Sequence, residues 1–198
     1  MMDISNEAEG LRQRKRRETL LRIAQTGLKL FVQNGYEQTT LEEIATAAGI
    51  SRRTFFYYFK SKEAILMAFL DGGFAKSIRP VLLSQSTEKT PFKATCDSII
   101  QLMSSHNREE AIIIARLLGS TESLKARMPG VFAEMEVTVY QTLCEMWPEP
   151  AKRTSLRMVS MAAIGAMRVA KENWLREDGK HPLQDYLIES FKTLENEI

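Results

Sequence analysis

Apolar residues recur at helical spacing along most of the chain, and no segment shows the strict alternation that predicts a β-strand. The first apolar stripe predicts a helix over residues 13–33, which the Asn34-Gly35 pair ends. Its apolar positions are Leu20, Ile23, Ala24, Gly27, Leu28 and Phe31. The chain therefore begins with a long amphipathic helix.

Residues 40–62 predict two short helices joined by a tight turn. Thr40 and Glu43 have the spacing of a capping box at the start of the first short helix. Gly49 stands where a left-handed residue ends that helix, and Ser51 is a favourable N-cap for the second. Together these local signals indicate a helix-turn-helix.

The second short helix carries an unusual outer face. Ile50 and Phe55 have the spacing of a hydrophobic staple, and Phe55 and Phe59 point to the core. The outward positions are Arg52, Arg53, Thr54, Phe56, Tyr57 and Tyr58. An ordinary helical pair with a solvated basic end is the alternative, but such a face would carry Glu, Lys and Gln rather than adjacent aromatic rings.

Helical patterns continue to the C-terminus. Ser61 caps a fourth helix that ends near Arg79-Pro80, because proline disfavours helix in the residue before it. Further helices are predicted over 92–105, 109–118, 129–146, 151–177 and from 183 onward, with a short segment at 119–128. His106-Asn107 is predicted as a turn, and Trp147–Pro150 and Asp178-Gly179 are predicted to interrupt the helices. The fold class is all-α.

The predicted helix over 151–177 is apolar on two sides, which requires burial between neighbours. One row comprises Leu156, Val159, Ala163, Ala166, Ala170 and Trp174, and a second, mostly small, row comprises Met158, Ala162, Gly165 and Val169. Both rows could complete the core of one protomer. A two-fold dimer is favoured, because a single helix-turn-helix reads only a short half-site.

Charge is distributed unevenly along a chain whose net charge is only +2. Of 27 Lys and Arg and 25 Asp and Glu in total, residues 1–62 hold 11 and 7, which leaves 16 and 18 for residues 63–198. A basic cluster formed by Arg12, Arg14, Lys15, Arg16 and Arg17 leads into the first helix. Beside a helix-turn-helix, this cluster indicates phosphate or minor-groove contacts, and a solvated arm is the alternative.

Catalysis, metal binding and membrane insertion find no support in the residues. The two histidines, His106 and His181, belong to no catalytic or zinc-binding set, and Cys96 and Cys144 lack metal-ligand spacing. No apolar run reaches membrane-spanning length, and the N-terminus is too polar for a secretory signal. We therefore expect a cytoplasmic protein with two reduced thiols that is not an enzyme and has no cofactor, metal or membrane partner.

Residues 17–64 closely resemble the DNA-binding domain of the TetR family of bacterial transcriptional regulators. The resemblance combines the NGY turn, the TT-x-x-x-IA helix, the AGIS turn, the aromatic run and SKE at the family's intervals. It implies a basic arm at 1–16, a three-helix helix-turn-helix DNA-binding domain at 17–62, and a helical ligand-binding and dimerisation domain at 63–198.

The resemblance also assigns DNA contacts, which are written here as expectations. Arg52 and Arg53 occupy base-reading positions, and an arginine there can bond guanine O6 and N7. Phe56 replaces the family's frequent tyrosine, so a thymine methyl becomes its expected neighbour. The expected contacts to phosphate or sugar are Thr40, Thr54, Tyr57, Tyr58 and Lys62.

The RRTFF-x-YF run at 52–59 and the tail A-x-x-x-A-x-x-x-W-x-x-x-DG at 166–179 are similar to a branch that includes mycofactocin-type regulators. This resemblance implies long-chain acyl-CoA or related acyl ligands as inducers. Apolar residues on several helices could line such a pocket, although for each of them plain core is the favoured alternative. The candidates are Met67, Phe74, Met103, Ile113, Leu117, Phe132, Met135, Met167 and Trp174, with Arg116 and Arg168 for an anionic group. Salt bridges to Glu110, Glu134 or Glu172 are the alternative for the two arginines.

These features predict a dimeric repressor that binds a palindromic double-stranded operator and is released by a small apolar or amphipathic ligand, acyl-CoA-like in this branch. The alternative is a constitutive or architectural DNA-binding regulator without a ligand.

Overall fold

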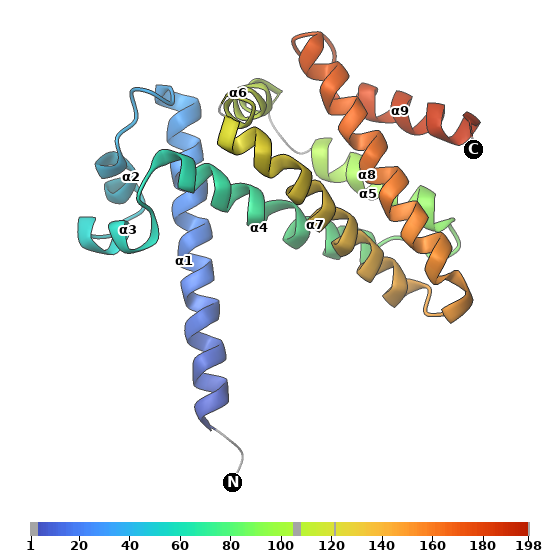
Figure 1. Cartoon of the computed structure of the whole chain (residues 1–198), viewed down its shortest axis with the longest axis horizontal. Coiled ribbons are helices and arrows are strands. Elements are labelled where there is room, and N and C mark those ends of the chain that lie inside the picture. Colours follow the sequence, from blue (N-terminus) through green and yellow to red (C-terminus); the bar gives the residue numbers. More distant parts are fainter. Residues whose placement is uncertain (1–3, 105–107, 121, 198) are drawn as a thin grey trace. The chain divides into compact units, whose positions relative to one another are not determined.

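The computed structural model describes residues 4–104, 108–120 and 122–197, and within them every regular element is a helix (Figure 1). The elements are α1 (Ile4–Asn34), α2 (Leu41–Ala47), α3 (Arg52–Tyr58), α4 (Lys62–Leu83), α5 (Pro91–Ser104), α6 (Arg108–Leu118), α7 (Glu122–Met146), the 3-10 turn η1 (Pro150–Lys152), α8 (Arg153–Arg176) and α9 (Leu183–Glu197). The all-α prediction is confirmed.

The chain divides into two compact units, residues 1–72 and 73–198. The boundary falls inside α4, ten residues after the one that the sequence placed at 62/63. In the core of the first unit, the predicted apolar stripe of α1 packs with residues of α2, α3 and the start of α4. Its fully buried side chains include Ile23, Phe31, Ile44, Phe55, Ile65 and Leu66.

The second unit has a core built around α8, which packs against α5, α7 and α9. The first predicted row of α8 is confirmed as core-facing, since Leu156, Ala163, Ala170 and Trp174 are buried. The Trp174 indole N–H donates a hydrogen bond of 3.1 Å to the carbonyl of His181, so the only polar group of this buried ring has a partner.

Three predicted helix boundaries are wrong. Helix α1 begins at Ile4 rather than near 13, so the described part of the basic arm is helical. Helix α4 continues through Pro80 to Leu83, and α7 starts at Glu122 and runs through Pro129 instead of starting there. A proline removes one hydrogen bond from a helix, and the burial of Leu82 and Leu124 favours the longer helices over a break. The predicted turn at His106-Asn107 lies outside the described residues.

The predicted stop after α8 is a left-handed turn. Asp178 and Gly179 have φ values of 57° and 64°. A Cβ atom on Gly179 would also meet Cδ1 of Ile112, so that side chain would have to shift, and the positive φ already favours glycine here.

The two cysteines occupy different environments. Cys96 is buried in the core of the second unit, and burial raises the pKa of its thiol far above the ordinary range. Cys144 on α7 is only partly buried. Neither forms a disulfide, in agreement with the two reduced thiols that the sequence predicts.

Lys171 is a partly buried lysine of α8. It lies between the turns that carry the buried Met167 and Trp174. Within the described residues no carboxylate forms an ion pair with it, and desolvation lowers the pKa of its ammonium group.

We expect Lys171→Met to increase the free energy of unfolding, most strongly at pH values below the lowered pKa of the folded-state lysine. There the lysine is charged in both folded and unfolded states, so the folded protein bears the full desolvation cost. As the pH rises through the lowered folded pKa towards the unfolded value of 10.5, the folded state loses its proton first and the advantage of the variant shrinks. Urea unfolding at several pH values measures this, with the exposed Lys192→Met as control. An advantage that stays constant with pH would contradict the assignment.

None of the described helices is long and apolar enough to cross a membrane.

Candidate nucleic-acid interface

Helix α2 is held at both ends by its own residues and by α1. The Thr40 hydroxyl accepts the backbone N–H of Glu43 at 3.2 Å, and the Glu43 carboxylate accepts the backbone N–H of Thr40 at 2.7 Å. These hydrogen bonds complete the predicted capping box and lower the pKa of Glu43. At the other end, Arg22 of α1 donates to the carbonyl of Ala48 at 3.0 Å.

The turn between α2 and α3 has the predicted geometry. Gly49 has φ of 66°, and the Ser51 hydroxyl accepts the backbone N–H of Thr54 at 3.1 Å. The Thr54 hydroxyl lies 2.8 Å from that of Ser51. Because α3 has only seven residues, this cap and the core contacts fix its position.

Helix α3 presents the predicted outer face. Phe55 and Phe59 are buried and anchor the helix. The exposed residues are Arg52, Arg53, Thr54 and Tyr57, and Phe56 and Tyr58 are partly exposed. Tyr57 keeps 64% of its surface accessible. This exposed ring, beside two exposed arginines, makes the outer face of α3 a candidate binding surface.

The aromatic rings of α3 lie close to cationic side chains of the first unit and to one another. The Arg16 guanidinium lies 5.4 Å from the centroid of the Tyr57 ring, and Tyr57 meets Tyr58 edge to face at 5.3 Å. Arg16 belongs to the basic cluster, so the helical N-terminal extension contributes to the same surface as α3. The side chain of Arg12 lies outside the described residues.

The two arginines of α3 have different surroundings. Arg52 pairs with Glu42 of α2 at 3.0 Å and lies 5.6 Å from the centroid of the Phe56 ring. For Arg53 the described residues provide neither an ion pair nor a ring contact. Nothing in the sequence pattern identified Glu42 as a partner, because the contact depends on the angle between α2 and α3.

Lys62, an expected phosphate contact, is bound within the protein. Its ammonium group donates to the carbonyls of Tyr36 at 2.7 Å and Glu37 at 3.0 Å and lies 5.0 Å from the Tyr36 ring centroid. Lys62 therefore joins the start of α4 to the loop between α1 and α2.

We expect Lys62→Met to destabilise the first unit by about 1–3 kcal/mol, because two carbonyls lose a charged hydrogen-bond donor. Chemical denaturation followed by circular dichroism measures this. Lys29→Met, which removes an exposed lysine of α1, serves as control and is expected to change stability by less than about 0.5 kcal/mol. Equal stability of the Lys62 variant and the wild type would show that these bonds contribute nothing.

The nine apolar candidate ligand residues occupy different environments. Phe74, Met167 and Trp174 are buried core residues, with Met103, Phe132 and Met135 packed against that core. Ile113 and Leu117 are partly exposed on α6, and Met67 belongs to the first unit.

The two candidate arginines are both paired. Arg116 forms an ion pair with Asp178, which the sequence analysis did not name. Arg168 lies 3.6 Å from Glu172, one of the predicted alternatives, and 5.8 Å from the centroid of the Phe132 ring. An anionic ligand at either position would share the arginine with a carboxylate or replace that carboxylate.

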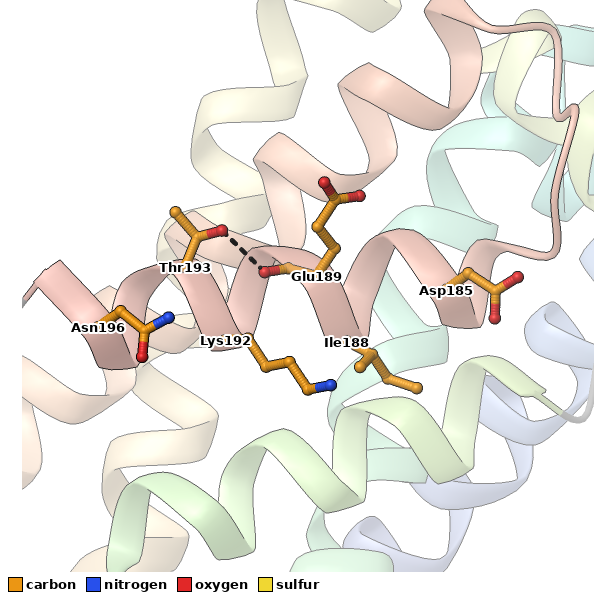
Figure 2. A pocket seen from close by; sticks show the side chains of 6 residues that line it. All are labelled: Asp185, Ile188, Glu189, Lys192, Thr193 and Asn196. Atoms are coloured by element: carbon orange, nitrogen blue, oxygen red, sulfur yellow. Dashed lines mark hydrogen bonds between the residues drawn. The ribbon is translucent and has the colours of Figure 1, made fainter.

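The two hollows recorded on the surface contain none of these eleven residues. One is an open depression along α9, and Figure 2 shows that all six of its residues come from that helix, with Thr193 bonded to the Glu189 carbonyl. The other is a groove between α8 and α9, lined on the α8 side by Ala162, Gly165, Ala166, Val169 and Asn173. This groove contains most of the predicted row of small residues.

A helix-turn-helix with a capped, basic and aromatic second helix, followed by an all-helical unit, defines a DNA-binding transcriptional regulator. Two family models match: "Bacterial regulatory proteins, tetR family" over residues 23–69 and "MftR C-terminal domain" over residues 90–198. The chain therefore belongs to the TetR family, with an MftR-type C-terminal domain.

Two curated relatives illustrate the likeness. The transcriptional regulator TcmR of Streptomyces glaucescens is 48% identical over 58 residues, which cover 29% of this chain and only 26% of TcmR. MftR of Mycobacterium tuberculosis, named for the regulation of mycofactocin biosynthesis, is 24% identical over 170 residues, or 83% of this chain and 84% of MftR. Both are named as transcriptional regulators.

Among solved structures, the TetR-family repressor FadR of Thermus thermophilus in complex with lauroyl-CoA has a TM-score of 0.58 and 21% identity. The comparison covers 90% of this chain and 92% of that one. At this identity the likeness shows a shared fold.

Proposed function

We propose that this protein is a dimeric repressor that binds a palindromic operator and releases it when a small apolar or amphipathic ligand binds. The observation that carries the proposal is the outer face of α3, where Arg53 and Tyr57 are exposed on a helix anchored by buried Phe55. In this proposal residues of α3 contact base edges, and Arg16 and the N-terminal extension contact the backbone.

The outer face of α8 supports pairing with a second copy of the chain. Met158, Met161 and Val169 are exposed by 66%, 49% and 45%, which is unusual for neighbouring apolar residues on one helix. They adjoin the groove of small residues between α8 and α9. Two-fold pairing would bury this surface and place two α3 helices about 34–36 Å apart, in successive major grooves.

Acyl-CoA-like ligands are the class to test first, because the FadR neighbour binds lauroyl-CoA. A ligand that empties the operator must favour the non-binding state by about 5.5 kcal/mol to move the population from 1:99 to 99:1. Its acyl chain would need an apolar site in the second unit, where Phe132 and Met135 pack at the edge of the core.

The proposal is tested with duplexes recovered by the full-length protein from a randomised pool. We expect tight binding by fluorescence anisotropy, and we expect lauroyl-CoA both to raise the melting temperature and to release the duplex, with free CoA as control. Duplex binding that no acyl-CoA alters would favour the constitutive regulator instead. Failure to bind any duplex at low salt would overturn the proposal.

A further inference from the structure

The strongest feature that the proposed function leaves unexplained is an acidic residue on the DNA-facing surface. Glu42 lies in the first turn of α2, and its carboxylate is 3.0 Å from the Arg52 guanidinium at the first position of α3. DNA is a polyanion, so a carboxylate at this place opposes binding. The residue therefore needs a compensating role.

Stability is a weak explanation for the Glu42–Arg52 pair. The two side chains keep 50% and 73% of their surface accessible. Exposed ion pairs of this kind contribute about 0–1 kcal/mol. Helix α2 also has its own cap, since the adjacent Glu43 completes the capping box.

Orientation of Arg52 is the better explanation. An arginine side chain has several rotatable bonds, and here two contacts restrict it: Glu42 at the Nη2 atom and the face of the Phe56 ring at 5.6 Å. The guanidinium has five N–H donors in a planar fork, so one carboxylate leaves donors free for guanine O6 and N7. A side chain already held in one orientation loses less conformational entropy when it binds a base.

We propose that Glu42 is a positioning residue for sequence reading: its carboxylate holds the Arg52 guanidinium in one orientation on the DNA-facing surface. The inference rests on the proposed DNA-binding function. Arg53, one residue further along α3 and without a recorded partner among the described residues, provides the internal comparison. Glu42 thus lowers total affinity and raises discrimination between bases.

The test is a double-mutant cycle in the full-length protein. Glu42→Gln, Arg52→Ala and the double variant are measured by anisotropy against the best duplex from the randomised pool and against the same duplex with each base pair changed. We expect the Glu42→Gln variant to bind all duplexes more tightly than the wild type. At one base pair, the ratio of its affinities for the best duplex and the changed duplex should fall about tenfold, which is the scale of one arginine–base contact. When Arg52 is already alanine, adding Glu42→Gln should leave the discrimination between base pairs unchanged.

Two controls separate orientation from charge. Glu37→Gln removes an exposed carboxylate of the same unit, and it should raise affinity without changing discrimination at any base pair. Glu42→Gln combined with Arg53→Ala should give additive effects. Thermal melting verifies that each variant is folded.

The inference is overturned if Glu42→Gln keeps full discrimination at every position, or if discrimination falls equally with and without Arg52. In both cases the wild type still binds the selected duplex, so the proposed function survives. If the wild type binds no duplex at low salt, the proposed function fails and takes this inference with it.

Discussion

Replacing Arg53 and Tyr57 together by alanine is expected to abolish operator binding while leaving the protein folded. Both side chains are exposed on α3, and the Tyr57 ring lies beside the Arg16 guanidinium and the Tyr58 ring. An arginine–base contact is worth about 1–3 kcal/mol, and a two-fold dimer loses each contact twice. We expect the affinity to fall by about 1,000-fold, which corresponds to the middle of this range for two arginine contacts.

Fluorescence anisotropy with the selected duplex measures the loss, and circular dichroism during heating verifies the fold. The matched control is Arg157→Ala with Tyr140→Ala, which removes the same two residue types from a cation–π pair of the second unit. That variant should retain operator affinity. If the folded Arg53 and Tyr57 double variant binds as tightly as the wild type, the contact assignments are wrong.

Val169→Glu should convert the proposed dimer into monomers and thereby weaken operator binding. In the proposed interface, Val169 lies in the small-residue groove between α8 and α9. Burying an unpaired carboxylate there costs several kcal/mol. A monomer holds one half-site instead of two, so we expect at least about a 100-fold loss in affinity for the palindrome, which corresponds to about 2.7 kcal/mol.

Sedimentation equilibrium measures the association, and anisotropy measures the operator affinity. Val137→Glu on α7 makes the same change at a position of similar exposure, 40% against 45%, and should leave the dimer intact. A Val169→Glu protein that remains dimeric would place the interface on another surface.

The helix-turn-helix could be predicted in detail because its signals are local. The Thr40 capping box, the left-handed Gly49 and the Ser51 cap each act within four residues, and all three have the predicted geometry. The burial of Phe55 and Phe59 follows from their spacing in the same way. The roles of the outward residues in DNA binding stay predictions.

Features that depend on the approach of distant segments could not be predicted. Glu42 reaches Arg52 only because the turn sets the angle between α2 and α3. Arg116 meets Asp178, sixty-two residues away, through the packing of the second unit. The helix boundaries predicted at prolines are wrong for a related reason, because packing outweighs a local preference. At Pro129 the local penalty for proline in a helix is smaller than the gain from burying residues on both sides of it.

The different burial of the two thiols has a practical consequence. Cys96 is enclosed in the core, where its thiolate is strongly disfavoured, whereas Cys144 keeps part of its surface accessible. A maleimide dye should therefore attach to the native protein at Cys144 alone, since the thiolate is the reactive form. The natural sequence thus already offers a single attachment point on α7 for a fluorescent reporter, without any engineered cysteine.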